Sequence, residues 1–105
     1  MNQQQAKMLK QLQQMQQKMA EAQEKLALET VDASAGGGMV TAVVSGAREL
    51  VSLRIDPQCI DPKDPQMLQD LVLAAVNQGL QRAAALAEEE MRRAASGLGL
   101  PPGML

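Results

Sequence analysis

Aromatic residues and histidine are both absent from this 105-residue sequence. Without Phe, Tyr or Trp the chain has no platform on which to stack splayed bases, as proteins that bind single-stranded nucleic acid usually do. Leu, Val, Met and Ala must fill the interior, which predicts a thin core that self-association would support. Without His the commonest general base and metal ligand is missing, and this disfavours an enzyme.

Cysteine and long apolar runs are also scarce. The single cysteine, Cys59, excludes an internal disulfide, and no Lys or Arg lies within three residues to activate its thiol. We therefore interpret it as a structural residue in a loop. No apolar run is long enough to span a bilayer and no leader sequence is recognisable, so we expect a soluble cytoplasmic protein.

The net charge of -2 is unevenly distributed. Residues 1–26 hold four Lys against two Glu, which leaves six basic against ten acidic residues in the remainder. The overall charge disfavours a nucleic-acid partner, whereas the local charge of the first segment permits one.

Residues 1–26 are predicted to form a helix, because good helix formers continue without Gly or Pro. Apolar residues recur at steps of four and three, at Met8, Leu12, Met15, Met19, Ala22 and Leu26. On a helical wheel this apolar stripe covers roughly 80°, which is the width of a coiled-coil seam or a helix pair. The helix is therefore expected to pack against one partner only.

Three lysines of this helix, Lys7, Lys18 and Lys25, fall within roughly 20° of one another on the same wheel. Two interpretations remain open at this point. The line is either a solvated face, with Glu21 pairing with Lys18 and Lys25, or a face that binds anions.

The run Gly36 to Gly38 predicts a tight chain reversal, because glycine adopts backbone angles that other residues avoid. Strands are expected at 28–33, 39–45 and 49–55, which form a three-stranded antiparallel meander within residues 27–56. A phosphate-binding P-loop is disfavoured, since it would need Gly-Lys-Ser/Thr followed directly by a helix.

The third strand alternates in polarity. Val51, Leu53 and Ile55 are expected to face the core, with Ser52 and Arg54 on the opposite face. Arg48 and Arg54 are then candidates for surface contacts.

The segment DPQCIDPKDP ends the sheet, and Asp64 and Pro65 are typical of a helix start, which predicts a helix over 64–96. One side of this helix is expected to be buried, at Leu68, Val72, Ala75, Gly79, Ala83 and Leu86. The opposite side is polar, at Asp70, Asn77, Gln81, Glu88 and Arg92.

Glu90 falls on the buried side of this helix, where an unpaired charge would be costly. We therefore expect the helix to leave the body of the protein before Glu90, so that residues 88–93 form a projecting, solvated end in which Glu89 pairs with Arg93. Residues 97–105 are expected to be a flexible tail.

Several separated segments together resemble one family, in the right order and over the whole chain. They are the Gln/Lys/Met helix followed by SAGGGMV, VVSG, LRIDP, DLVLAAVNQGL and the terminal GLGLPPGML. This combination resembles the YbaB/EbfC family of bacterial nucleoid-associated proteins.

The resemblance implies a single domain over residues 1–105 with an α+β fold, assembled as a homodimer from which helices project. It implies binding of duplex DNA with little sequence specificity, in the nucleoid, without a cofactor or a small-molecule substrate. Within it we choose the candidate DNA contacts from charge and helix position: Lys7, Lys10, Lys18, Lys25, Arg92 and Arg93.

Two other classes of function remain as alternatives. Two helices joined by a hairpin, with Met-rich stripes, also resemble prefoldin and a holdase-like interaction module, although the helices are too unequal in length for a long coiled-coil pair. An enzyme is the weakest hypothesis, because Asp56, Asp61 and Asp64 are typical of turns and caps and could offer only oxygen ligands, as for calcium or magnesium.

Overall fold

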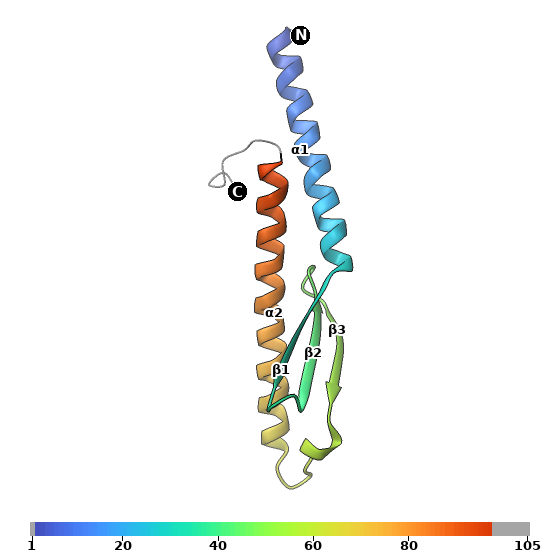
Figure 1. Cartoon of the computed structure of the whole chain (residues 1–105), viewed down its shortest axis with the longest axis vertical. Helices are drawn as coiled ribbons and strands as arrows, with labels where there is room; N and C mark the ends of the chain where they lie inside the picture. The colour runs from blue at the N-terminus through green and yellow to red at the C-terminus, as the bar shows by residue number, and fades with distance from the viewer. Residues whose placement is uncertain (1, 98–105) are drawn as a thin grey trace.

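The computed structural model describes residues 2–97, which form an elongated α+β molecule of 73 × 22 × 16 Å (Figure 1). The expected tail, except for Gly97, lies outside the described residues. The elements occur in the order α1 (Gln3–Leu28), β1 (Thr30–Ala35), β2 (Val40–Ser45), β3 (Leu50–Ile55), the short 3₁₀ helix η1 (Pro57–Cys59) and α2 (Pro65–Ser96). Within residues 2–97, neither helix combines the length and apolar character that a membrane span needs.

The three strands form the expected antiparallel meander in the order β1-β2-β3. Gly36, Gly37 and Gly38 all have positive φ and make the reversal between β1 and β2. β1 begins at Thr30, two residues later than predicted, because α1 continues to Leu28.

The core lies between α2 and one face of the sheet. Val40, Ala42 and Val44 of β2 are fully buried there. Small residues on α2 allow the helix to approach closely, and a Cβ atom built on Gly79 would lie only 2.7 Å from Val44 Cγ2. The predicted buried side of α2 is confirmed, with Ala75, Gly79 and Ala83 buried and Leu68, Val72 and Leu86 half-buried.

The segment between the sheet and α2 is built from side-chain caps. Asp64 accepts a hydrogen bond from the Met67 backbone N–H at 3.2 Å and thereby caps α2. Asp56 and Asp61 likewise accept backbone N–H groups two residues further on, each at 2.9 Å. Their interpretation as turn residues is confirmed. Cys59 is buried in the core cluster with Val40 and Ala75, in η1 instead of a loop, as a structural residue.

The predicted core face of β3 is wrong in part. A β-bulge between Val43 and Val44 shifts the register so that Leu50, and not Val51, lies opposite Val44. Val51 is 59% exposed as a result, and Leu53 is 37% exposed although its neighbour Ala42 is fully buried. Leu53 lies on the helix-facing side of the sheet, but α2 packs mainly against β1 and β2 and leaves most of β3 uncovered. Only the last residue of β3, Ile55, packs against the core cluster as predicted.

Candidate nucleic-acid interface

The helix α1 runs antiparallel to α2 and extends beyond its end (Figure 1). The apolar stripe of α1 shows where contact stops: Leu26 and Ala22 are buried, Met19 and Met15 are half-buried, and Leu12 and Met8 are exposed. The prediction that α1 packs against one partner only is wrong in part: α2 is its main partner, but the C-terminal end of α1 also contacts β2. We call the N-terminal part of α1, residues 3–18, the arm; residues 3–14 of it are exposed throughout.

The arm begins with a capping box. The Asn2 side-chain oxygen accepts a hydrogen bond from the Gln5 N–H at 2.8 Å, and the Asn2 N–H donates to Gln5 Oε1 at 3.4 Å. Two backbone donors that the first helical turn leaves free are satisfied in this way. The pattern Asn-x-x-Gln ahead of the helix is the sequence signal, which our sequence analysis missed.

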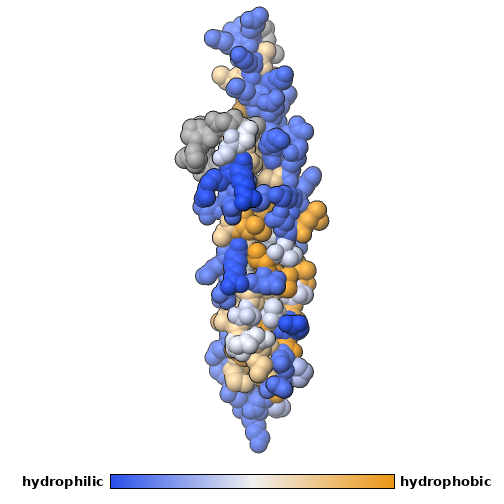
Figure 2. All heavy atoms as spheres, in the orientation of Figure 1, coloured by the Kyte–Doolittle hydropathy of each residue, from blue (hydrophilic) through white to orange (hydrophobic). Residues whose placement is uncertain are grey.

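The cations of the arm are open to solvent. Lys7 and Lys10 are exposed and make no ion pair within residues 2–97, while Lys18 Nζ lies 3.8 Å from the exposed Glu21 carboxylate. Lys7 and Lys18 are about 16 Å apart along the axis, at 1.5 Å per residue. Figure 2 shows this part of the molecule as largely hydrophilic, with apolar side chains gathered below it over the sheet.

Lys25 is placed differently from the other three lysines. Its Nζ lies 3.2 Å from Glu90 Oε1 and 3.3 Å from Glu90 Oε2, and 3.6 Å from Glu29 Oε1. The hydrogen bond and charge of Glu90, with a smaller contribution from Glu29, raise the pKa of the Lys25 ammonium above its usual 10.5. The expected pairing of Lys25 with Glu21 is wrong, because these two carboxylates take the place of Glu21.

The expected solvation of Glu90 is also wrong. Glu90 is only 7% exposed and lies between α1 and α2. The helix α2 therefore does not leave the body at this point; it remains packed, with α1 as its new neighbour and Lys25 as the compensating charge. The cation that allows Glu90 to be buried comes from the other helix, so the pattern of α2 alone does not reveal it.

The two candidate arginines lie near the end of α2. Arg92 pairs with Glu88 at 3.5 Å, and Arg93 pairs with Glu89 at 2.7 Å as predicted. Arg93 also reaches Glu90 at 3.4 Å. The structure thus brings Lys25 and Arg93 together around one carboxylate, while Lys7 and Lys10 lie apart from them on the arm.

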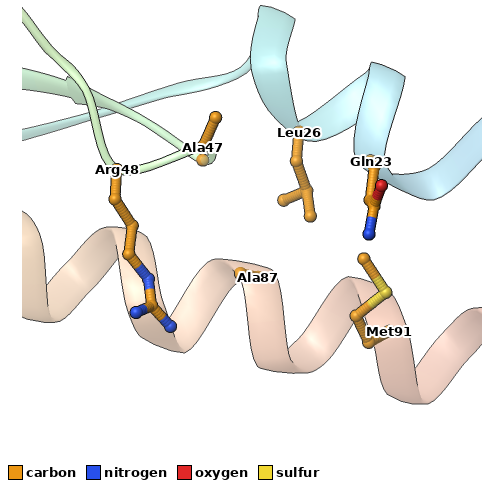
Figure 3. Close-up of a pocket in the computed structure, with 7 residues that line it drawn as sticks. Gln23, Leu26, Ala47, Arg48, Ala87 and Met91 are labelled. Carbon is orange, nitrogen blue, oxygen red and sulfur yellow. The ribbon is translucent and has the colours of Figure 1, made fainter. Parts of the chain in front are cut away.

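A shallow hollow of about 320 Å³ lies below the arm, where α1, α2 and the β2-β3 turn meet (Figure 3). Leu26, Met91 and Ala87 contribute its apolar lining, and Gln23 and Arg48 lie at its margins. Arg48 has a φ of 65° and is exposed. Arg54 on β3 is also exposed. Both arginines are accessible, as the sequence analysis expected, but neither lies on the arm.

The fold and its exposed lysines define an α+β protein with a projecting cationic helix. The sequence profile of the YbaB/EbfC DNA-binding family matches residues 1–98, and the chain belongs to this family. The resemblance deduced from the sequence motifs is thereby confirmed.

Relatives and a solved structure agree with this assignment. A nucleoid-associated protein of Syntrophobacter fumaroxidans is 52% identical over 93 residues, covering 89% of this chain and 84% of the relative. Another, from Pelotomaculum thermopropionicum, is 47% identical over 91% of both chains. The crystal structure of an uncharacterized protein from Helicobacter pylori superposes with a TM-score of 0.69 at 29% identity, covering 94% of this chain and 99% of that one.

Proposed function

We propose that this protein is a nucleoid-associated protein that binds duplex DNA as a homodimer, with little preference for sequence. Family membership supports DNA as the partner. The observation that carries the mechanism is the arm, a helix that stands clear of the body and exposes Lys7 and Lys10 without a competing carboxylate in residues 2–97. Ammonium groups in this position are free to approach phosphates.

The binding is electrostatic in this proposal. Each lysine that neutralises a phosphate releases condensed counterions, so affinity falls as salt rises, with a slope of about −0.9 in log K against log salt for every contact. Phosphate contacts carry no sequence information by themselves. The chain also has no aromatic residue with which to stack on an unpaired base. Duplex is therefore preferred over single strands.

The six candidate cations divide into two groups. Lys7, Lys10 and Lys18 are the proposed phosphate contacts, with Arg92 as an exposed second choice near the base of the arm. Lys25 and Arg93 are engaged by the buried Glu90 carboxylate. Moving either of them to a phosphate would remove a partner from a buried charge, which is costly.

The homodimer is supported by the uncovered strand β3. Leu50 and Leu53 lie on the helix-facing side of the sheet and are 46% and 37% exposed, and β3 is an edge strand. Leu73 of α2 is also exposed. Open strand edges and clustered apolar side chains commonly mark an interface with another chain. A second copy covering this face would give one molecule two arms.

Measuring the mass in solution tests the dimer. We expect twice the chain mass of 11.2 kDa. The Leu53→Lys variant should be monomeric, because it places a charge at the centre of the proposed interface. Ser52→Lys introduces the same charge on the other face of β3 and serves as the matched control. A monomeric wild type, or a dimer that Leu53→Lys leaves intact, would rule out this interface.

Titration of labelled duplexes by fluorescence anisotropy tests the partner. Two duplexes of equal length and unrelated sequence should bind with affinities that differ by less than about threefold. A sequence-specific protein would show a much larger difference, because each mismatched base pair in its site costs about 1–3 kcal/mol. A single strand of the same length should bind more weakly. Absence of duplex binding at low salt would refute the proposal, and strong preference for one sequence would refute its mechanism.

A further inference from the structure

The ion pairs around Glu90 join the two helices at the base of the arm. We propose that Glu90 is a positioning residue for DNA binding: by holding Lys25 of α1 against α2, it fixes the direction in which the arm projects. This inference rests on the proposed function for its consequence on DNA, but the geometry of the latch itself can be tested without DNA. We use the word latch for Glu90, Lys25 and Arg93.

The contacts of Glu90 come from both helices. Its carboxylate accepts hydrogen bonds from Lys25 of α1, at 3.2 and 3.3 Å, and from Arg93 of α2, at 3.4 Å. Glu29 and Glu89 are the further charged groups of the cluster, and each pairs with one of the two cations. Two cations thus converge on the Glu90 carboxylate, and each cation has a second carboxylate partner.

Burial makes this arrangement restrictive. The Glu90 side chain is 9% exposed, whereas those of Lys25 and Arg93 are 57% and 64% exposed. The two cations could be solvated without each other, but the carboxylate would remain in the helix interface without its partner from α1. Removing one partner of a buried pair is strongly unfavourable, and buried pairs are also less screened by salt than surface pairs. The latch therefore favours one placement of α1 on α2.

The latch lies far from the end of the arm, so a small rotation at the latch moves the end of the arm by a large distance. Lys25 lies in the part of α1 that α2 still covers, while Lys7 and Lys10, two of the main proposed phosphate contacts, lie on the part of α1 that extends beyond the end of α2. Lys7 is about 27 Å along the helix from Lys25, at 1.5 Å per residue. A rotation of about 10° at the latch would displace Lys7 by about 5 Å, which exceeds the axial rise of about 3.4 Å between phosphates of one strand.

Loss of the latch therefore has a functional cost. An arm that samples many directions must be ordered again when it binds, and this reduces the apparent affinity. Substitution of Lys25 should therefore weaken DNA binding even though Lys25 does not contact a phosphate in this proposal. A charge exchange distinguishes the two roles, because Lys25→Glu combined with Glu90→Lys preserves an ion pair but places an acidic residue at position 25.

A single tryptophan can report the arm position, because the chain has no aromatic residue of its own. Met19 is half-buried on the stripe of α1, and Met19→Trp places an indole near the end of α2. In this background, Lys25→Glu and Glu90→Lys should each shift the emission to longer wavelength in the absence of DNA. The charge exchange should return it toward the wild-type wavelength but not fully, because the exchanged charges lie beside Glu29 and Arg93, which have the same signs. Glu90→Gln should shift the emission to longer wavelength by a smaller amount than Glu90→Lys. Far-UV circular dichroism verifies that every variant is folded.

Duplex affinity is then measured on the same variants. Glu88→Lys is the matched control, since it changes the net charge equally on an exposed part of α2. Glu90→Lys should bind at least about tenfold more weakly than Glu88→Lys, and the charge exchange should bind at least about tenfold more tightly than Lys25→Glu, a factor that corresponds to about 1.4 kcal/mol.

Two results would overturn the proposal. Unchanged emission in the folded single variants would show that the latch does not hold the arm. Restored emission in the charge exchange, with affinity as low as that of Lys25→Glu, would show that DNA requires the lysine itself. Failure of the wild type to bind any duplex would instead refute the proposed function, and the emission measurements would still decide whether the latch exists.

Discussion

Gly46 shows how one residue fits the C-terminal end of α1 against the sheet. Its N–H donates to the Glu29 carbonyl at 2.9 Å, and a Cβ atom built on it would lie 2.6 Å from the Leu26 backbone oxygen. The second strand was predicted to end at residue 45, directly before this glycine. The reason for it is a close contact with the end of α1, and a contact between residues so far apart in sequence leaves no local signal.

Gly46→Ala is expected to destabilise the protein by about 1–3 kcal/mol, the usual cost of overpacking. The obstructing atom belongs to the backbone of α1 and can move only if the helix end moves. Urea unfolding followed by circular dichroism measures this cost. Gly97→Ala is the control, because its added Cβ would meet atoms no nearer than 3.6 Å and should change stability little. Equal stability of the two variants would contradict the close contact.

The raised pKa of Lys25 predicts how the stability of the protein depends on pH. Since its pKa in the folded state is raised above the usual 10.5, its contribution is fully present below that pH and is lost as pH rises through the folded value. Wild type should therefore lose more stability above pH 10.5 than Lys25→Met, which has no ammonium to lose. Urea midpoints for both proteins at a pH below and a pH above this value provide the measurement. Parallel losses would contradict the raised pKa.

At the scale of elements, the arm is a helix with little tertiary support. Residues 2–14 are all exposed, so this part depends on helix propensity and on its cap. Short helices without packing partners are marginal in water. The capping box of Asn2 and Gln5 is therefore the main local feature that keeps Lys7 and Lys10 on a helix.

Asn2→Ala is expected to remove about 1 kcal/mol of helix stability at this end. Amide hydrogen exchange should become faster in the first turns of α1 and remain unchanged in α2. Asn77→Ala on the exposed side of α2 is the matched control, since it removes the same side chain away from any helix end. Unchanged exchange near Lys7 would show that the cap does not stabilise the arm.

The sequence predicted those elements whose signals are local. The glycine run, the cap at Asp64 and the apolar periodicity of both helices identified the α+β order, the meander and the buried face of α2. It failed where the partner was remote: Glu90 is buried because Lys25 from another helix neutralises it. The bulge at Val51 likewise depends on how β3 pairs with β2, and the alternation of polarity along β3 alone does not reveal it. The arm was predicted as a helix. The residue at which α1 loses contact with α2 could not be predicted, because it depends on how far the two helices overlap.

At the scale of the whole molecule, the proposed dimer interface and the proposed DNA contacts lie at opposite ends. The sheet and most of α2 form one end of a 73 Å molecule, with the uncovered face of β3 available to a second copy, and the arm forms the other end (Figure 1). A twofold axis through β3 would place two arms in one particle. In the proposed function, the body sets the separation of the arms and the arms supply the charge.

The salt dependence of duplex binding tests this account most directly. The slope of log K against log salt is measured for wild type and for the triple variant Lys7→Ala, Lys10→Ala and Lys18→Ala. Lys63→Ala is the control, because it removes one exposed cation at the opposite end of the chain's long axis. The triple variant should have a slope smaller in magnitude by about 0.9 for each phosphate contact removed, counted over both copies in a dimer, and Lys63→Ala should match wild type. A triple variant that retains the wild-type slope and affinity would show that the arm does not bind DNA.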